Sequence, residues 1–482
     1  GQHRTVYRLR LPFGNFYLKH YKLAGPRDLL QNTVRPCRAQ LEYRAAEAVA
    51  RAGISTVEPV ALGMTQLGPL VADSFLVCRE IAGTEPLDRF IRARTGATAF
   101  APQHTLRAGI AVELGRLTAA LHRAGLIHRD YHAGNVLIDS NVEQRVRLWL
   151  IDLHAVSRCR FLTRARVEAN LAQLNNFFVE RATAADRHRF FVAYWDALHA
   201  DAATSSDILA QAFPAAVKRL QRVFDRTVAD AYRRGDRKWS RGNRRLIIAD
   251  TQNVRCRGLS RLGPELIARI RDEPDTVLGD LQTNTFDDPR HPPAALPTEA
   301  GILRISVSTS PSDSSPRQAW ETGHALLRRG IPVAEPLVFA EPAGPGTGRQ
   351  LLLTELPYRS MTLRERLEHV LPELDERRRE GSLQGTGEQL ARKLRRLREL
   401  GFEHGRLSAD NVLVPDRPDV HSVWFTSLTD ITRSRRPSSD RWVESLAKLD
   451  ASLAGMRCIR NTHRLRFLKC FLGPKHVRDW KQ

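Results

Sequence analysis

The pattern of apolar and polar positions divides the first half of the chain into a strand-rich part and a helical part. Alternation in VYRLRL and FYLKHYK predicts two strands joined by a hairpin turn at Pro12–Asn15. A helix is expected from Gln40 to Ala52, and SFLVCREI is typical of a buried strand. One apolar helix face is formed by Leu106, Ile110, Leu114, Leu117 and Leu121, because these residues recur at helical spacing.

Short strands, NVLID and VRLWLID, follow this helix around a turn. Beyond residue 160 the chain is predicted to be helical, with an apolar stripe at Leu171, Leu174, Phe177 and Phe178. Strands first and helices afterwards indicate an α+β fold, in which a small β-sheet lobe precedes a larger helical lobe.

An internal repeat runs through the whole chain. LHRAGLIHRDYHAGNVLI matches LRELGFEHGRLSADNVLV, and RAGISTVEPV matches RRGIPVAEPL. LWLIDLHAVSR matches TSLTDITRSR, which pairs Asp152 with Asp430, and LAQLN matches LAKLD. Four matches in the same order at nearly constant offset predict two copies of one domain in tandem.

We expect the two copies at residues 1–235 and 236–482. The second copy is predicted to open near Asn243, with RRLIIAD and VRCRGLS as a strand pair. The matching segment of the first copy falls before residue 1, so the first domain is expected to lack its first strands here. The basic junction, Arg233–Arg245, is either a solvated linker or a contact with an anionic surface. The Pro-rich stretch His291–Pro297 is predicted to be a loop.

The loop HRDYHAGN carries the candidate chemistry. Phosphoryl transfer needs a carboxylate that orients or deprotonates the attacking hydroxyl, and oxygen ligands for Mg²⁺. Asp130 is the candidate for the first role, and Asn135 and Asp152 are candidates for the second, because hard cations prefer oxygen ligands. The combination of this loop with a following hydrophobic-Asp pair predicts a kinase fold that uses ATP and Mg²⁺. His132 either contacts phosphate or substrate, or only fills space in the loop.

A cation for the nucleotide phosphates is expected on the second strand. Lys19 lies inside an otherwise apolar strand, where an ammonium group needs a partner, and Glu42 in the next helix is the candidate. The alternatives are Lys22 for the lysine and Glu47 for the glutamate. By chain order alone, the backbone around Glu80 and Ala82 is predicted to hold adenine. No G-x-G-x-x-G loop stands ahead of Lys19.

The second copy has changed at these positions. Arg406 stands in place of Asp130, Ala319 in place of Glu42, and only Arg304 is available near the strand lysine, whereas Asn411 and Asp430 remain. Losing a general base costs roughly 10²–10⁴ in rate. The second copy is therefore predicted to be a degenerate, pseudokinase domain.

Composition narrows the choice of partners. The 482-residue chain has 75 Lys and Arg against 53 Asp and Glu, and its formal charge of +22 favours anionic partners. Nucleic acid is not expected, because no binding motif accompanies the charge. Six cysteines without a zinc pattern, and no apolar run long enough to span a bilayer, suggest reduced thiols in a cytosolic protein.

The motifs HRDYHAGNVLID, LWLIDLHAVSRCRF and FYLKHYK resemble the bacterial lipopolysaccharide core heptose kinase family, from Val6 to about Trp195. The resemblance implies ATP-dependent phosphorylation of a sugar hydroxyl on the lipopolysaccharide inner core or on a related glycolipid or small molecule. It implies Asp130 as catalytic base, Asn135 and Asp152 as metal ligands, and Lys19 with Glu42 at the phosphates. It also implies a cytoplasmic protein with peripheral contact to the anionic inner face of the inner membrane.

Two features depart from that family. Its familiar members have a single domain, and a glycine precedes Asn135 here, as in aminoglycoside and choline kinase-like loops. Two alternatives stay open. One is a protein serine/threonine kinase-like enzyme, but the sequence after Asp152 contains no A-P-E element, which argues against it. The other is a non-catalytic nucleotide-binding scaffold, against which stands Asp130.

Overall fold

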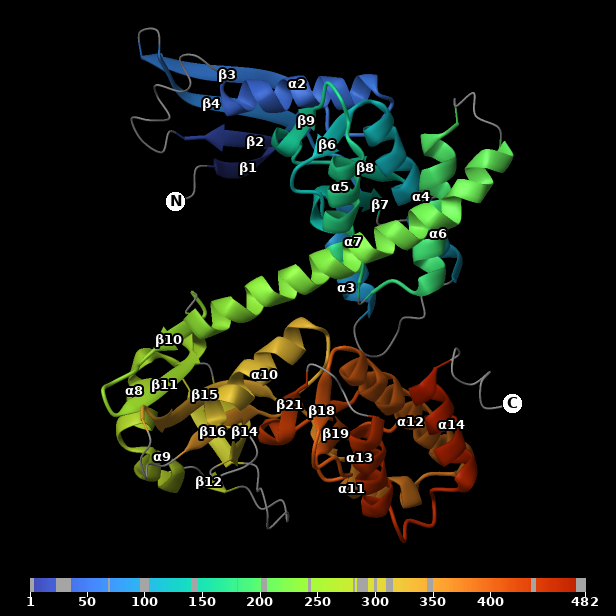
Figure 1. Cartoon of the computed structure of the whole chain (residues 1–482). Coiled ribbons are helices and arrows are strands. Elements are labelled where there is room, and N and C mark those ends of the chain that lie inside the picture. Colours follow the sequence, from blue (N-terminus) through green and yellow to red (C-terminus); the bar gives the residue numbers. More distant parts are fainter. Residues whose placement is uncertain are drawn as a thin grey trace. The chain divides into compact units, whose positions relative to one another are not determined.

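The chain divides into two compact units, Gly1–Asp230 and Ala231–Gln482. The computed structural model describes residues 4–22, 36–67, 70–95, 104–139, 146–179, 181–200, 206–241, 244–280, 282–283, 294–298, 301–308, 315–344, 350–434 and 439–473. The division falls inside one long helix, α7 (Ser206–Arg241), shown in Figure 1. The sequence predicts the boundary in this same helix, after residue 235.

The first unit opens with an antiparallel sheet whose strand order is β1-β2-β4-β3. Its strands are β1 (Arg4–Leu11), β2 (Gly14–Tyr21), β3 (Pro59–Leu67) and β4 (Leu70–Arg79). The hairpin between β1 and β2 closes at the predicted turn, where Gly14 has φ 139°, a conformation that glycine adopts far more readily than other residues.

Helix α2 (Arg38–Arg51) packs one face against this sheet. Its buried residues, Ala39, Glu42, Ala46 and Val49, recur every three or four positions. Ala39 belongs to the core of the sheet lobe with Tyr21 and Leu76, whereas Ala46 and Val49 belong to the core of the helical lobe. The helix therefore joins the two lobes of the first unit and places Glu42 between them.

The rest of the first unit is mainly helical (Figure 1). In α4 (His104–Arg123), the predicted apolar face is buried at Ile110, Leu114, Leu117 and Leu121, as its spacing predicts. The other elements are β5 (Thr84–Pro86), α3 (Leu87–Thr95), β6 (Leu126–His128), η1 (Ala133–Asn135), β7 (Val136–Asp139), β8 (Leu148–Leu150), η2 (Leu153–Ala155), β9 (Val156–Arg158), α5 (Arg164–Phe178) and α6 (Ala184–Leu198).

The second unit begins with a strand pair and two short helices, and then follows the order of the first. Its elements up to the end of the sheet are β10 (Leu246–Ile248), β11 (Val254–Leu259), η3 (Ser260–Leu262), α8 (Pro264–Asp272), α9 (Pro274–Asp280), β12 (Gln282–Thr283), β13 (Ala294–Thr298), β14 (Gly301–Ser308), α10 (Pro316–Arg328), β15 (Glu335–Pro342) and β16 (Leu351–Glu355). The elements of its helical lobe, which includes short strands, are β17 (Ser360–Thr362), α11 (Leu363–Glu365), η4 (Arg366–Val370), η5 (Leu371–Glu373), α12 (Glu376–Glu399), β18 (Phe402–His404), β19 (Val412–Pro415), β20 (Trp424–Phe425), η6 (Leu428–Asp430), β21 (Ile431–Arg433), α13 (Ser439–Ser452) and α14 (Asn461–Leu472).

Strand topology repeats between the units. The sheet of the second unit contains the order β13-β14-β16-β15, which reproduces β1-β2-β4-β3. Strands β10 and β11 extend it beyond β15, and β12 extends it beyond β13. The small sheets β5-β7-β8 and β6-β9 recur as β17-β19-β20 and β18-β21. Each unit thus pairs a small sheet lobe with a helical lobe, which confirms the predicted tandem α+β fold.

Two local expectations differ from the structure. Residues 294–297 of the stretch expected to be a loop belong to β13, where Pro297 pairs with Ile302 at the hairpin end; residues 291–293 lie outside the described part of the chain. The basic junction is not a linker over its first part, because Arg233–Arg241 continues α7. Asn243 lies outside the described residues, and the predicted strand pair that follows it forms as β10 and β11.

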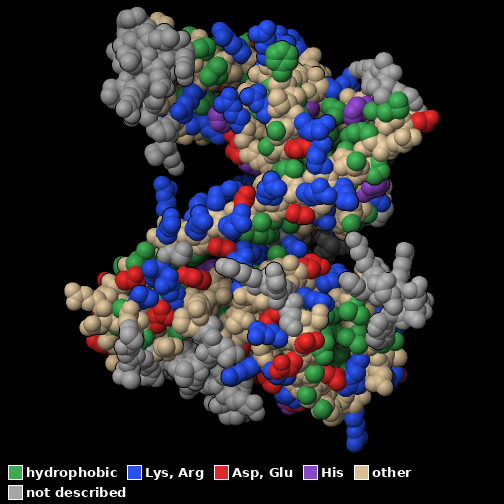
Figure 2. All heavy atoms as spheres, in the orientation of Figure 1, with side chains coloured by type: hydrophobic (Ala, Val, Ile, Leu, Met, Phe, Trp, Pro, Cys, Tyr) green, Lys and Arg blue, Asp and Glu red, His purple; other side chains and the backbone are tan. Residues whose placement is uncertain are grey.

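Basic side chains gather along the visible face of α7 (Figure 2). Lys218, Arg222 and Arg226 of this helix are exposed. Among the described residues, no helix is both long enough and apolar enough to serve as a membrane span.

Within the second unit, Asp236 ties the C-terminal end of α7 to the end of α10. The carboxylate accepts a hydrogen bond from Arg329 Nη2 at 2.7 Å, and it also pairs with Arg328. The Arg329 side chain is only 2% exposed, and it stacks on Tyr232 at 4.5 Å. We predict that Asp236→Ala destabilises the second unit by roughly 3–5 kcal/mol, because it leaves a buried guanidinium without its carboxylate.

Hydrogen exchange in urea, followed by peptides of each unit, measures this loss. Asp225→Ala, on the same helix, is the matched control, because this exposed carboxylate accepts a hydrogen bond from an exposed glutamine, Gln221. Equal unfolding free energies for Asp236→Ala and Asp225→Ala would contradict the prediction.

Candidate active site

Lys19 and Glu42 meet between the sheet and α2. Lys19 stands opposite Leu76 in the register of β2 with β4, and its Nζ donates to Glu42 Oε1. The Tyr21 hydroxyl donates to the other oxygen, Oε2. Glu42 is 1% exposed, so both partners are needed to keep its charge buried. The structure thus brings together the pair selected from the sequence.

The two alternatives lie elsewhere. Lys22 is exposed at the end of β2, and Glu47 forms an ion pair with Arg51 one helical turn away, at 3.1 Å. Burial and the charge of Glu42 raise the pKa of Tyr21, so its hydroxyl remains a proton donor to the carboxylate.

Asp130 and Asn135 lie in the loop between β6 and β7, in different surroundings. The Asp130 carboxylate is 62% exposed, and Asn135 is buried. Asn135 Nδ2 donates to the Asp130 backbone carbonyl at 2.8 Å, which closes the loop on itself. Within the described part of the chain, Asn135 Oδ1 accepts no hydrogen bond, so a side-chain carbonyl oxygen remains for a ligand.

His132 caps the turn η1. Its Nδ1 accepts the Gly134 backbone N–H at 3.0 Å, which assigns the proton of a neutral ring to Nε2. Nε2 lies 3.5 Å from Asp130 Oδ2. His132 is therefore both a structural cap and a neighbour of the candidate base, and its contact with phosphate or substrate stays a prediction.

The loop is held from the helical side by polar side chains that the sequence reasoning missed. Asn170 Nδ2 donates to the His128 carbonyl at 2.6 Å, and Gln173 Nε2 donates to the Arg129 carbonyl at 2.9 Å. His122 bonds Asn170 Oδ1 at 3.1 Å and the Tyr194 hydroxyl at 2.8 Å. Burial lowers the pKa of His122 to about 4, so this network is neutral at pH 7.

A sequence signal for this support does exist. Asn170 and Gln173 are one turn apart on α5, and each donates to one of two consecutive carbonyls of the loop. The same contacts recur in the second unit, where Ser445 Oγ donates to the His404 carbonyl at 3.0 Å and Lys448 Nζ to the Gly405 carbonyl at 2.9 Å. Gln173 and Lys448 lie within the repeated LAQLN and LAKLD segments, and Asn170 and Ser445 directly precede them, but the residue types differ.

Asp152 follows β8 and has left-handed backbone geometry, with φ 61°. Aspartate tolerates this conformation better than most residues. Its Oδ1 accepts hydrogen bonds from Arg4 and, at 2.8 Å, from His154 Nδ1. Burial alone would raise the pKa of Asp152, but the hydrogen bonds from His154 and Arg4 and the charge of Arg4 outweigh it and hold this pKa well below its usual value. The carboxylate is therefore ionised.

These oxygens fit a magnesium ion. Mg²⁺ is usually held by one or two protein oxygen ligands together with substrate phosphates. The Asn135 amide oxygen, which accepts no hydrogen bond from a described residue, and the ionised carboxylate of Asp152 satisfy that requirement. No group of three or more His, Cys, Asp or Glu residues suited to an all-protein metal site occurs among the described residues.

The segment predicted to hold adenine links the sheet to β5. The Glu80 backbone N–H donates to the Asn15 carbonyl at 2.9 Å, and the Ile81 carbonyl accepts from Thr84 Oγ1 at 2.7 Å. The Glu80 carboxylate is held by both Arg8 nitrogens, at 2.8 and 2.9 Å. These groups are used within the protein, so base recognition at Glu80 and Ala82 stays a prediction.

In the second unit, Asp430 is not the counterpart of Asp152, which corrects the sequence pairing. The backbone N–H of Ile151 bonds the Asn135 carbonyl, and that of Thr426 bonds the Asn411 carbonyl, both at 3.0 Å. The next residue has left-handed geometry in both units: Asp152 in the first and Ser427, φ 51°, in the second. The sequence pairing was therefore displaced by three residues, from Ser427 to Asp430.

The backbone N–H of Arg129 donates to the Ala155 carbonyl, and that of Gly405 donates to the Asp430 carbonyl, both at 2.9 Å. Asp430 therefore occupies the place of Ala155. Its side chain lies 3.7 Å from Arg406 Nε. Asn411 Nδ2 bonds the Arg406 carbonyl, as Asn135 bonds that of Asp130. Asn411 Oδ1, however, accepts the Ser408 backbone N–H at 2.9 Å, so this oxygen is occupied.

The strand position of Lys19 also differs from the sequence pairing. In the register of β2 with β4, Lys19 stands opposite Leu76. Leu352 on β16 corresponds to Leu76, and in the register of β14 with β16 it stands opposite Ser308. Arg304 pairs with Ala295 nearer the middle of β14. The counterpart of Lys19 is therefore Ser308 and not Arg304. The linker from β2 to α2 is longer than the linker from β14 to α10, so the sequence alone does not align the two strands correctly.

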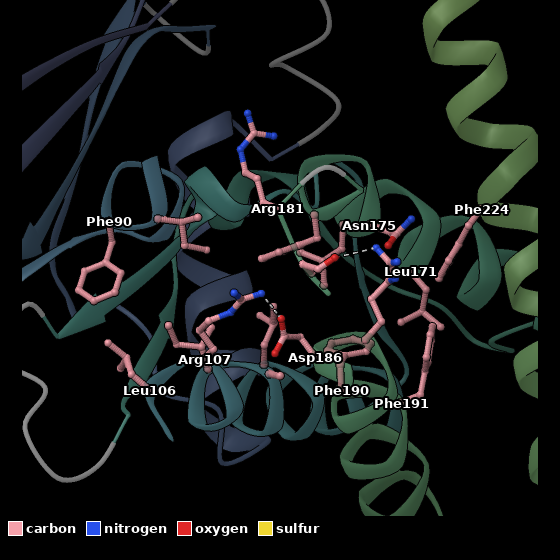
Figure 3. Close-up of a pocket in the computed structure, with 18 residues that line it drawn as sticks. Phe90, Leu106, Arg107, Leu171, Asn175, Arg181, Asp186, Phe190, Phe191 and Phe224 are labelled. Carbon is pink, nitrogen blue, oxygen red and sulfur yellow. Dashed lines mark hydrogen bonds and ion pairs between the residues drawn. The ribbon is translucent and has the colours of Figure 1, made fainter. Parts of the chain in front are cut away.

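A cavity of about 130 Å³ lies among α3, α4, α5 and α6, away from these residues (Figure 3). Phe90, Phe190 and Phe191 contribute to its apolar lining, and Arg107 pairs with Asp186 at its edge. The second unit has a cavity of about 330 Å³ at the same place between α12, α13 and α14. Both helical lobes thus contain a cavity between corresponding helices.

A sheet lobe with a buried Lys–Glu pair, followed by a helical lobe with this Asp–Asn loop and Asp152, defines a protein-kinase-like unit. The model of the lipopolysaccharide kinase (Kdo/WaaP) family matches residues 4–194 and 311–468, one segment in each unit. The chain belongs to this family, whose members are kinases, and the predicted family is confirmed.

Two similar proteins add detail. The lipopolysaccharide core heptose(I) kinase WaaP of Pseudomonas aeruginosa is 28% identical over 158 residues, which cover 31% of this chain and 58% of the relative. The chain thus spans less than two thirds of that relative's length. The solved structure of WaaP in complex with acyl carrier protein is 21% identical, covers 45% of this chain and 86% of its own, and has a TM-score of 0.33, too low to support an argument.

We predict that Asn170→Ala destabilises the first unit by about 1–3 kcal/mol, because it leaves the His128 carbonyl and His122 Nε2 unpaired in the core. Hydrogen exchange in urea measures the loss in peptides of the first unit. Asn176→Ala is the control, since Asn176 is exposed on the same helix. Comparable unfolding free energies in the two variants would refute the supporting role of Asn170.

Proposed function

We propose that the first unit is an ATP-dependent kinase that phosphorylates a sugar hydroxyl of the lipopolysaccharide inner core or of a related glycolipid. One observation carries the proposal. The ion-paired Lys19, the open Asp130 carboxylate and ionised Asp152 occur together in the first unit, whereas the second unit has Ser308, Arg406 and Ser427 at these positions.

Each residue has a role in this proposal. The exposed Asp130 carboxylate accepts the proton of the acceptor hydroxyl as it attacks the γ-phosphorus. His132 Nε2–H, 3.5 Å away, keeps that carboxylate oriented. Lys19, held by buried Glu42, binds the nucleotide phosphates. Mg²⁺ bound through Asn135 Oδ1 and Asp152 would neutralise negative charge on the phosphates. The segment at Glu80 and Ala82 borders the adenine.

An anionic acceptor is supported by the stretch from the end of β9 into the first turn of α5. Arg158, Arg160, Arg164 and Arg166 are exposed, and none forms an ion pair with a described residue. Phe161 beside them is 75% exposed. Arginine recognises phosphate groups through paired donors, and a sugar carrying phosphates on a lipid would present them. We place the reaction at the cytoplasmic face of the inner membrane, where the basic surface would contact anionic lipid.

We propose that the second unit is a pseudokinase. Ala319, Ser308, Arg406 and Ser427 stand at the positions of Glu42, Lys19, Asp130 and Asp152. The carbonyl of the remaining Asn411 is occupied. Its helical support of the loop is retained through Ser445 and Lys448. This pattern favours a folded domain without phosphoryl transfer.

We predict that Asp130→Ala lowers phosphoryl transfer by roughly 10²–10⁴, since the acceptor loses its base, and leaves ATP binding within twofold. Transfer to core oligosaccharide from a deletion strain, read by mass spectrometry, measures the rate. Arg406→Ala, the same position in the second unit, should retain the wild-type rate. Equal rates for Asp130→Ala and the wild type would reject the mechanism.

We predict that Asn135→Ala raises the Mg²⁺ concentration for half-maximal nucleotide binding by about tenfold or more, because one of two oxygen ligands is lost. Asn411→Ala in the second unit should leave this concentration unchanged. Titration of Mg²⁺ at fixed ATP, followed by calorimetry, separates the two variants. An equal shift in both, or in neither, would contradict the assignment of the metal to the first unit.

A further inference from the structure

Arg4, at the start of β1, forms an ion pair with the proposed metal ligand Asp152. Its Nη1 donates to Asp152 Oδ1 and lies 3.4 Å from His154 Nδ1. The side chains of Arg4 and Asp152 are 33% and 18% exposed. Residues far apart in the chain thus meet at the junction of the sheet lobe and the helical lobe.

Arg4 is also connected to the Lys19 pair. In the register of β1 with β2 it stands opposite Tyr21, with which its side chain interacts. Tyr21 donates to Glu42, which accepts Lys19 on its other oxygen. A continuous chain of contacts therefore runs from Asp152 through Arg4, Tyr21 and Glu42 to Lys19, and it places two cations, Arg4 and Lys19, at one site.

The guanidinium has donors to spare. Arg4 uses Nη1 for Asp152, and an arginine offers five N–H donors in a planar fork that suits phosphate oxygens. In protein kinases a glycine-rich loop covers the phosphates with backbone N–H groups. The hairpin turn ahead of Lys19 contains one glycine, Gly14, and no G-x-G-x-x-G sequence precedes Lys19. Arg4 on β1 and Lys19 on β2 are two side chains that bring positive charge to this site.

We propose that Arg4 is a further phosphate-binding residue, which exchanges Asp152 for a phosphate oxygen of ATP when the nucleotide binds. The inference rests on the proposed kinase function. Before binding, Arg4 balances the charge of Asp152. Once Asp152 serves the metal, Arg4 balances the charge of the polyphosphate instead. No ion is left unpaired in either state, which makes the exchange favourable.

Three variants of the full chain test this role: Arg4→Ala, Arg4→Lys and the control Arg10→Ala, which removes an exposed arginine from the same strand. Calorimetry gives the dissociation constants of Mg·ATP and of adenosine for each. We expect Arg4→Ala to weaken Mg·ATP binding by about tenfold to a hundredfold, as for the loss of a charged hydrogen bond. Arg4→Lys should be intermediate, and Arg10→Ala should equal the wild type.

Adenosine affinity, within twofold of the wild type in all variants, shows that Arg4→Ala is folded and that the loss concerns the phosphates. If Arg4→Ala binds Mg·ATP as tightly as the wild type or more tightly, Arg4 only shields Asp152 in the free protein and the inference is wrong. A loss of adenosine affinity equal to that of Mg·ATP also overturns it.

Failure of the kinase function gives a different result. A wild type that binds Mg·ATP but transfers no phosphate would reject the proposed function while leaving the Arg4 measurement intact. A wild type that binds no nucleotide would reject both.

Discussion

The buried carboxylate of Glu42 is the constraint on which the first unit depends. A charge at 1% exposure is stable only when both oxygens are bound, and here Lys19 and Tyr21 bind them. These contacts fix α2 against β2 and hold the ammonium of Lys19 at the junction of the lobes. Removing Glu42 would leave Lys19 without its anion, and removing Lys19 would leave a buried charge. The second unit has Ala319 at this place, and its corresponding helix, α10, packs through apolar residues such as Trp320.

The comparison of the two units separates what the fold needs from what the proposed chemistry needs. Both units support the loop after their first long helix by side chains from the next helix, Asn170 and Gln173 in one and Ser445 and Lys448 in the other. Both keep an asparagine that closes the loop. The charged groups differ. Loop support is therefore a requirement of folding, and the charged groups are the part that one copy has lost.

Much of this arrangement follows from the sequence. Alternation predicts β1 and β2, helical spacing predicts α4, and the repeat predicts the tandem units, because each pattern reflects local burial. The pairing of Lys19 with Glu42 was predictable, since an ammonium in an apolar strand requires an acid nearby. The counterparts Ser308 and Ser427 were not, because register depends on hydrogen bonds between residues far apart in the chain, which the sequence does not show. Arg4 was missed for the same reason: its partner is 148 residues away.

We predict one functional nucleotide site per chain. Calorimetric titration of the full chain with Mg·ATP measures this number most directly. A stoichiometry of one, abolished by Lys19→Ala and unchanged by Arg304→Ala, is the predicted result. Two sites per chain, or one site that persists in Lys19→Ala, would contradict it.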